Sequence, residues 1–490
     1  MMKFNSKHII LSFFMVFSVL LMCVSDVCAE DADNITIQAT EQITQVNDVI
    51  GEDLVVNNIN RAGSFHELQL LINNNDVVNL TKDYAAMGSE GSVLITSNKT
   101  INGNGHTLNG NALTKIFEIK GGNIVFNNIT FINGKNDDDD GGAIYVFNAD
   151  SLTFNNIIFE NNQARGYGGA VSIFNCNSIS FLNCDFLKNN AISGGAIYTT
   201  GSLDIIDCLF NYNGAKQYGG AIYANNVGVI SSNFRSNEAL CGGGAIFGNN
   251  MVEVVDSIFK FNLVNINGSA ICSVNNVTVK NSTFDSNIAS GDMFTQCCGG
   301  AISSAHDVKV DNSIFLNNHA EDYGGAIYAD TVTWVESLSY FVVNYAEDNQ
   351  GGAIYTNRFT TDVKYGIFIG NQAKDDDGGA IYINKENHIT FSRCTFKDNY
   401  AADEGGAIYL DSLSSVLTLK DHDSFINNSA GDEGQAVFNK GTYGEIRNNW
   451  WGTSLPNFSK DLLVEWKTIG FNERHTDSKP LNNFFDRGDN

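Results

Sequence analysis

Short acidic runs stand directly before a repeated glycine pair, and carboxylates placed in this way could bind a cation. The runs occupy residues 137–140, 321–322, 347–348, 375–377, 403–404 and 432–433. Stacked carboxylates repel one another unless a cation lies between them, and Ca²⁺ accepts oxygen ligands in flexible geometry. Ca²⁺ is the only cofactor suggested, with candidate ligands Asp138, Asp139, Asp140, Asp375, Asp376, Asp377, Asp403 and Glu404. The spacing matches no established calcium loop, so a hydrated acidic edge that keeps the chain soluble is the alternative.

A tyrosine also recurs at a constant place, two residues after the alanine of Gly-Gly-Ala. It is found at Tyr145, Tyr198, Tyr223, Tyr328, Tyr355, Tyr382 and Tyr409. If the preceding residue points inward, strand alternation directs the tyrosine outward and creates an aromatic stripe. Such a stripe suits contacts with sugars or proteins, because tyrosine combines apolar area with a polar tip. Packing of the rings against neighbouring loops is the alternative.

Both features belong to a repeat that runs through most of the chain. Gly-Gly-Ala, or a close variant, recurs 24 to 31 residues apart, and Phe-x-x-Asn usually starts nine or ten residues before the next glycine pair. Within one unit, residues 378–396, apolar side chains alternate over 381–383, 389–391 and 394–396. Period-two alternation indicates three short strands joined by Gly, Asn and Ser turns.

Three strands per turn predict an all-β fold, a right-handed parallel β-helix of about a dozen coils. We expect phenylalanines to stack in the core and asparagines to pair their amides between coils. The glycine pair is expected to supply positive φ at a tight corner. Cys184, Cys208 and Cys394 stand two residues before the repeat phenylalanine, where other coils have serine. We interpret them as small interior residues.

The first residues are typical of an export signal. Lys3 and Lys7 precede an apolar run over residues 9–24, and small residues end at Ala29. Cleavage there would leave a mature chain without a predicted membrane-spanning segment, which places it outside the cell or on the cell surface. An uncleaved anchor is the rival interpretation, although the run is shorter than the ~20 residues of a spanning helix.

The two ends of the array are expected to differ from the repeat. Ser64 and Glu67 resemble a capping box that opens a short amphipathic helix with Leu68, Leu71 and Ile72 inward. Terminal repeats need such caps. The predicted organisation is 1–29 signal peptide, 30–90 N-terminal extension and cap, 91–447 parallel β-helix repeats, and 448–490 C-terminal cap and tail.

The charge of the chain narrows the range of partners. The formal net charge is −26 and the isoelectric point is near 4.5. Nucleic acids and anionic membrane surfaces would be repelled by such a chain, so neither is expected to be a partner.

The motifs resemble those of known surface proteins. Alternating Gly-Gly-Ala-Ile and Phe-x-x-Asn resembles the repeat of the chlamydial polymorphic outer membrane proteins. The fuller pattern is similar to the adhesin-like β-helix proteins of methanogenic archaea, with Ser-Phe-x-x-Leu at 64–68, Asn-Gly-Asn-Gly at 102–105 and Asn-Trp-Trp-Gly at 449–452. The resemblance covers about residues 64–455. It implies a secreted or cell-surface β-helix with an adhesive role.

Two function classes follow from these observations. The first is an adhesin-like protein that binds glycans or cell-surface proteins without catalysis. The second is a carbohydrate-active enzyme, a polysaccharide lyase or hydrolase, because a β-helix scaffold does not fix function. An enzyme needs convergent acid and base groups. The histidines share no register in the repeat and basic residues are sparse along it, so no catalytic residue is predicted and the binding class is favoured.

Overall fold

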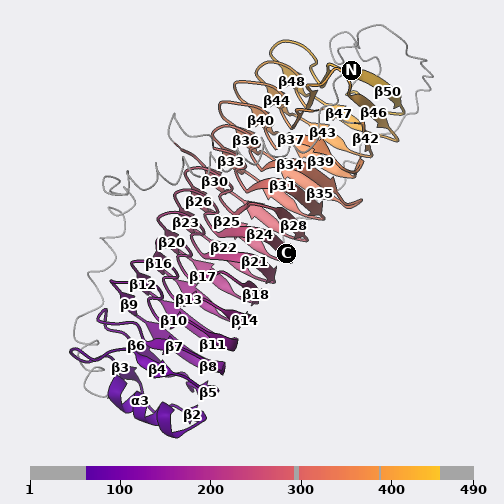
Figure 1. The fold of residues 1–490 in the computed structure, drawn as a ribbon. Helices are drawn as coiled ribbons and strands as arrows, with labels where there is room; N and C mark the ends of the chain where they lie inside the picture. The colour runs from indigo at the N-terminus through magenta and orange to yellow at the C-terminus, as the bar shows by residue number, and fades with distance from the viewer. Residues whose placement is uncertain (1–61, 292–296, 386–387, 453–490) are drawn as a thin grey trace, which may run out of the picture. The chain divides into compact units, whose positions relative to one another are not determined.

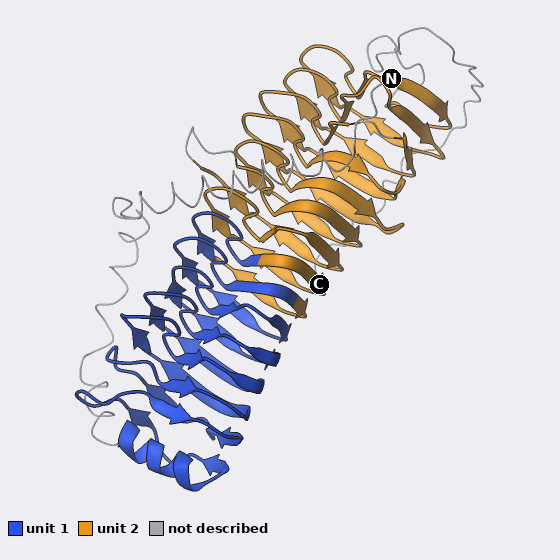
Figure 2. Cartoon of the chain, in the orientation of Figure 1, with its two compact units in different colours: residues 1–227, 237–247 blue, residues 228–236, 248–490 orange. Residues whose placement is uncertain are grey.

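The computed structural model describes residues 62–291, 297–385 and 388–452 (Figure 1). The chain divides into two compact units, residues 1–227 with 237–247 and residues 228–236 with 248–490 (Figure 2). Each unit is a parallel β-solenoid, and the two contain about 14 turns between them. The predicted all-β parallel β-helix is therefore confirmed. The predicted signal peptide and the stretch from 453 onward lie outside the described residues.

One coil of the first unit shows how the repeat folds. Its strands are β13 (Val171–Ile173), β14 (Cys176–Leu182), β15 (Asp185–Leu187) and β16 (Asn190–Ala191). Each pairs in parallel with the equivalent strand of the next coil; Val171, for example, lies opposite Ile197. The three predicted strands are present. The two-residue strand that ends in alanine is a fourth side, which the period-two pattern did not indicate.

The second unit repeats this plan with one change of sheet. A coil there contains β34 (Ile327–Trp334), β35 (Ser339–Val342) and β36 (Tyr345–Ala346). The next coil contains β37 (Ile354–Phe359), β38 (Val363–Lys364), β39 (Gly366–Ile369) and β40 (Gln372–Ala373). At β38 a separate four-stranded sheet begins, continued by β42 (His388–Ser392), β46 (Val416–Lys420) and β50 (Thr442–Arg447). The long second face is thus split from this coil onward.

Stacked phenylalanines fill the core of each unit. The Phe159 and Phe186 rings are 5.0 Å apart, and those of Phe315 and Phe341 are 4.6 Å apart and nearly parallel. All four side chains are fully buried. Removing this much apolar surface from water is the main favourable contribution to folding, at about 25 cal/mol per Å². The core prediction is confirmed.

A buried asparagine ladder runs beside the phenylalanines and satisfies the polar backbone at one corner. Asn318 shows the pattern: its Nδ2 donates to Oδ1 of Asn344 at 2.9 Å and to the carbonyl of Phe284 at 3.0 Å. Its Oδ1 accepts from the backbone N–H and Nδ2 of Asn287, at 3.1 and 2.9 Å. Within the first unit the ladder is formed by Asn162, Asn189, Asn213 and Asn237. Within the second it is formed by Asn262, Asn287, Asn318, Asn344, Asn371, Asn399 and Asn428.

The two glycines of each pair have different structural roles. The expectation that the pair as a whole supplies positive φ is wrong, because only the first glycine adopts it. The first glycine is left-handed, with φ of 64° at Gly324 and 76° at Gly351. The second is not left-handed. A Cβ built on Gly325 would lie 2.3 Å from the carbonyl oxygen of Gly352, and one on Gly352 would lie 2.1 Å from that of Gly379. The second glycine is therefore favoured because successive backbones approach closely there, although two coils have Ser269 and Gln435 at this position.

A short helix covers the first coil of the first unit, as expected. Helix α3 (Phe65–Asn74) is capped by Ser64, whose Oγ accepts from the Glu67 N–H at 3.1 Å. It buries Phe65, Leu68 and Ile72, while Leu71 is only half-buried. Strands pair with later coils already before residue 91, beginning with β1 (Gly63–Ser64). Within the described residues, no helix has the length and apolar character that crossing a bilayer requires.

Candidate functional site

The acidic residues lie in the loops between the fourth strand and the glycine pair. Their backbone joins adjacent coils: the Gly351 N–H donates to the carbonyl of Asp377 at 3.0 Å, and the Gly378 N–H to that of Glu404 at 3.0 Å. The side chains of Asp138, Asp139 and Asp375 are exposed. Asp140 is buried, and its Oδ1 accepts from the Tyr167 N–H at 2.6 Å. That carboxylate is therefore already engaged by the backbone.

Among the described residues, three carboxylates come close enough to share an ion. One oxygen each from Asp376, Asp377 and Asp403 lies within 4.8 Å of the others. Backbone donors hold two of them in place, since the Asp377 N–H donates to Oδ1 of Asp376 and the Glu404 N–H to Oδ1 of Asp377, both at 2.9 Å. Of the eight candidate calcium ligands, the structure thus unites Asp376, Asp377 and Asp403.

Burial and neighbouring charge raise the pKa of two carboxyls in this cluster. Burial, followed by the neighbouring Asp376, Glu404 and Asp403 charges, raises the pKa of Asp377 to about 7. The pKa of Asp376 is also raised, first by burial and then by Asp403. When a carboxyl has a higher pKa in the folded protein than in the unfolded chain, the folded protein becomes less stable as pH rises. The loss occurs between the unfolded pKa, near 3.8, and the folded pKa. A divalent cation between these oxygens would relieve this repulsion.

Millimolar calcium is expected to raise the midpoint of thermal unfolding by mass action on the folded state. A hundredfold excess over the dissociation constant would contribute about 2.7 kcal/mol. Because Asp377 holds a proton below about pH 7, the calcium shift should be larger at pH 8 than at pH 6. Replacing Asp375, Asp376 and Asp377 with asparagine should abolish it. Magnesium, which demands octahedral geometry, is the control. If both ions shift the midpoint of thermal unfolding equally, only the interpretation as a hydrated acidic edge remains.

The recurring tyrosines do form a stripe, but their flat faces contact one another. Ring centroids are 4.8 Å apart between Tyr198 and Tyr223, and 5.0 Å apart between Tyr382 and Tyr409. The stripe continues within each unit through Tyr145, Tyr328 and Tyr355, which are half-buried, and ends on phenylalanines. Tyr382 and Tyr409 are buried. Alternation therefore does not place these rings fully in solvent, because each ring stacks on its neighbours, and stacking leaves mainly ring edges for a ligand.

A second interior column contains the small residues that precede the phenylalanines. The Cys184 N–H donates to Sγ of Cys208 at 3.4 Å, and the Ser257 N–H donates to Oγ of Ser282 at 3.1 Å. Cys184, Cys208 and Cys394 are buried, which confirms their interpretation as interior residues. One coil departs from the pattern by placing Asp423 in this column. Its Oδ1 accepts from the Cys394 N–H at 2.8 Å, while its Oδ2 is buried without a partner among the described atoms.

Asp423→Asn is expected to stabilise the protein at pH 8 and to leave it unchanged at pH 4. Burial raises the pKa of the Asp423 carboxyl to about 8. The folded protein therefore keeps the proton while the unfolded chain releases it near pH 4, so stability falls as pH rises from about 4 to about 8. Each unit of pKa shift corresponds to about 1.4 kcal/mol. Thermal unfolding across this pH range measures the effect; Asp398→Asn, at an exposed position, is the control and should change little at any pH.

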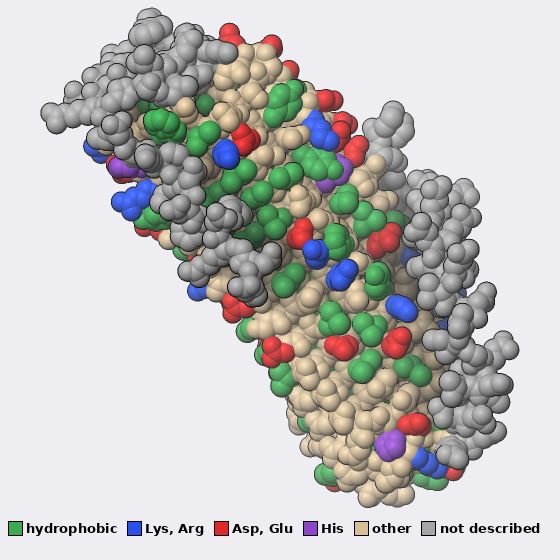
Figure 3. Space-filling view, turned by 180° about the vertical axis from the view of Figure 1, so that it is seen from behind, with side chains coloured by type: hydrophobic (Ala, Val, Ile, Leu, Met, Phe, Trp, Pro, Cys, Tyr) green, Lys and Arg blue, Asp and Glu red, His purple; other side chains and the backbone are tan. Residues whose placement is uncertain are grey.

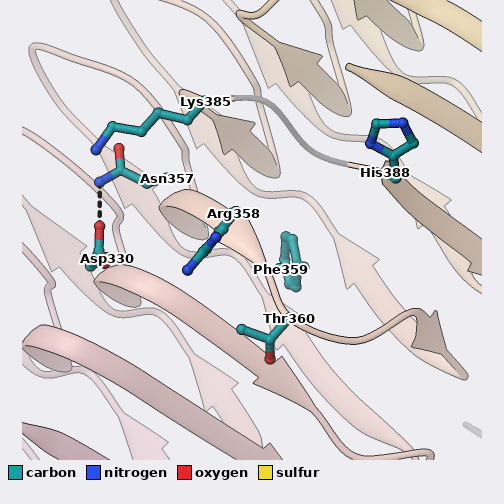
Figure 4. A pocket seen from close by; sticks show the side chains of 7 residues that line it. All are labelled: Asp330, Asn357, Arg358, Phe359, Thr360, Lys385 and His388. Carbon is teal, nitrogen blue, oxygen red and sulfur yellow. Dashed lines mark hydrogen bonds between the residues drawn. The ribbon is translucent and has the colours of Figure 1, made fainter. Parts of the chain in front are cut away.

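Sequence reasoning missed a pocket of about 800 Å³ on the second unit. It is lined by Asp330, Asn357, Arg358, Phe359, Thr360, Lys385 and His388. Figure 4 shows Lys385 and Asn357 beside Asp330, and His388 on the opposite side of the pocket. Arg358 lies between that group and His388. Asp330 lies on β34, four of the residues lie on or directly after β37, and His388 begins β42. The lining residues therefore come from three successive coils.

The fold and these ladders define a parallel β-solenoid repeat protein. Four stretches, residues 156–173, 207–225, 312–330 and 393–411, match the Chlamydia polymorphic membrane protein repeat. Each stretch spans the corner from the phenylalanine and ladder asparagine to the glycine pair. The chain thus carries repeats similar to those of the polymorphic membrane proteins. Searches of curated proteins and of solved structures find no match.

Proposed function

We propose that this chain is a surface-exposed or secreted adhesin-like protein that binds glycans or cell-surface proteins without catalysis. The observation that carries the proposal is the match of four coils to a repeat of polymorphic membrane proteins. The resemblance of the ends to archaeal adhesin-like β-helix proteins agrees with it. The solenoid exposes side chains from successive coils at equivalent positions, so it presents a repeated series of contact points.

The exposed surface is compatible with this role. On the face drawn in Figure 3, hydrophobic side chains are interspersed with acidic and basic ones. Such mixed surfaces suit contacts with proteins and hydroxylated ligands, where aromatic and aliphatic groups contribute beside hydrogen bonds. The net charge of −26 gives polyanions no long-range attraction to the chain, so an anionic ligand would have to be recognised by cationic side chains at its own binding site.

Purified chain beginning at residue 30 is expected to bind whole cells or a subset of an immobilised glycan panel, and to release no product from pectin, alginate or chitin. Binding is measured with labelled protein, and cleavage by the appearance of reducing or unsaturated ends. Product release that disappears on replacing one carboxylate would overturn the non-catalytic proposal in favour of a carbohydrate-active enzyme. Failure to bind any cell or glycan would contradict the adhesive role itself.

A further inference from the structure

The pocket on the second unit arises where one strand of the repeat is interrupted. β34 runs unbroken from Ile327 to Trp334, whereas the following coil is divided into β37 and β38. The Trp334 N–H donates to Oγ1 of Thr361 at 2.7 Å, which holds the interrupted segment against the preceding coil. The surface is therefore hollowed at the coil where β38 leaves the large sheet and begins a separate one.

A hydrogen-bonded column fixes one wall of this pocket. Asn357 is buried, and its Nδ2 donates to Oδ1 of Asp330 at 2.6 Å. Its own Oδ1 accepts from Nδ2 of Asn384 at 3.0 Å. The second carboxylate oxygen of Asp330 makes no hydrogen bond within the described residues, so it can accept one from a ligand hydroxyl. The wall is rigid before any ligand arrives.

Cationic groups converge on the same pocket, which is unusual in a chain with 29 basic and 55 acidic residues. The two cationic side chains, Arg358 and Lys385, line it together with His388, against the single carboxylate of Asp330. The Arg358 side chain is exposed and forms no ion pair or hydrogen bond within the described residues. A guanidinium presents paired donors that match the two oxygens of a carboxylate. An anionic group is therefore the complement of this side of the pocket.

The remaining groups suit a hydroxylated ligand above an apolar floor. Thr360 and Asp330 offer hydrogen-bonding atoms, and the side chain of Phe359 is 4% exposed and packs edge-on against Phe391, with centroids 6.3 Å apart. The volume lies within the ~300–1,000 Å³ typical of small-molecule sites. A sugar that carries a carboxylate combines all of these requirements in one ring.

We propose that this pocket binds the uronic acid unit of a glycan. The carboxylate pairs with the Arg358 guanidinium, with Lys385 adding positive charge. The ring hydroxyls hydrogen-bond to Asp330 and Thr360. This assignment rests on the proposed function for its biological setting, because it names the chemical class of ligand that an adhesin-like surface would recognise.

Calorimetric titration of the full chain with galacturonate trimer, galacturonate monomer and neutral galactose trimer tests the assignment. The acidic trimer is expected to bind at least tenfold more tightly than the neutral one. Comparing the acidic trimer with the monomer distinguishes an internal glycan unit from a free sugar acid. Equal affinities for acidic and neutral trimers, or no binding of either, would overturn the proposal.

Matched variants identify the contacts. Arg358→Gln should weaken binding of the acidic trimer by tenfold or more, whereas Arg165→Gln, which removes an equal charge from an exposed position in the first unit, should change it less than twofold. Asp330→Asn should reduce sugar binding but not the weak binding of acetate. Equal effects of the two arginine variants would refute the site. If the chain binds whole cells but binds no uronate, this site is rejected and the proposed adhesive role is still supported.

Discussion

Alanine at Gly352 is expected to lower the free energy of unfolding by roughly 3 kcal/mol or more, one of the largest effects of any single substitution in the array. Its Cβ would lie 2.1 Å from the carbonyl oxygen of Gly379 and 2.4 to 2.5 Å from the backbone of Gln372. These are backbone atoms of the next coil, which cannot move aside as a side chain could. Overpacking of a well-filled interior commonly costs 1–3 kcal/mol, and more when backbone must shift.

Urea unfolding of Gly352→Ala against the parent chain measures this loss. Gly91→Ala is the control, because a Cβ there meets nothing within 4 Å and its φ is not left-handed. The control should be neutral or slightly stabilising, since alanine reduces the entropy of the unfolded chain. If the two substitutions have the same effect, close backbone approach is not the reason for the second glycine of the pair.

Asn318→Ala is expected to destabilise the protein by about 3 kcal/mol. The change leaves the buried backbone N–H of Asn287 without its partner and removes donors from the carbonyl of Phe284 and from Oδ1 of Asn344. A buried donor left unsatisfied costs about 1–3 kcal/mol, and breaking a connected network gives the larger values. The cavity left by the amide adds to this.

The midpoint and slope of chemical unfolding provide the measurement. The control is Asn276→Ala: Asn276 is exposed and accepts one bond, from the Asp307 N–H at 3.2 Å. Its loss should cost well under 1 kcal/mol, because water replaces that bond. If Asn318→Ala lowers the free energy of unfolding as little as Asn276→Ala does, then alternative partners satisfy the buried ladder. The ladder would then not be a principal source of stability.

The core was predictable because its signals repeat at fixed spacing. Phenylalanine and asparagine recur at the same offset from the glycine pair, so stacking places like on like, as Phe315 on Phe341 and Asn318 on Asn344. The fourth side was not predicted, because a two-residue strand has no alternation to detect. Its signal was the alanine that recurs two residues after the ladder asparagine, such as Ala320 and Ala346, which pair across adjacent coils.

The candidate sites were harder to predict because they depend on loops and on exceptions to the repeat. Burial of Tyr382 and Tyr409 comes from the stacking of each ring on its neighbours, with Phe438 at the end, which strand alternation alone does not indicate. The pocket unites residues that occupy different repeat positions, Arg358 late in β37 and His388 at the start of β42. They meet where a new sheet begins at β38. Irregularities of this kind are visible in the structure, but the consensus sequence of the repeat does not contain them.

Each step of the asparagine ladder uses the same donor atom and the same acceptor atom, and this determines which changes in repeat number the gene can tolerate. A chain lacking residues 324–350 would place Asn371 where Asn344 lies, with the same amide ready to meet Asn318. Phe368 would stack on Phe315, and Ala373 would follow Ala320, in the same registers that their neighbours now occupy. Recombination between repeats that removes or duplicates one whole coil therefore yields a foldable product, whereas a frame-preserving deletion of half a coil breaks every ladder at once.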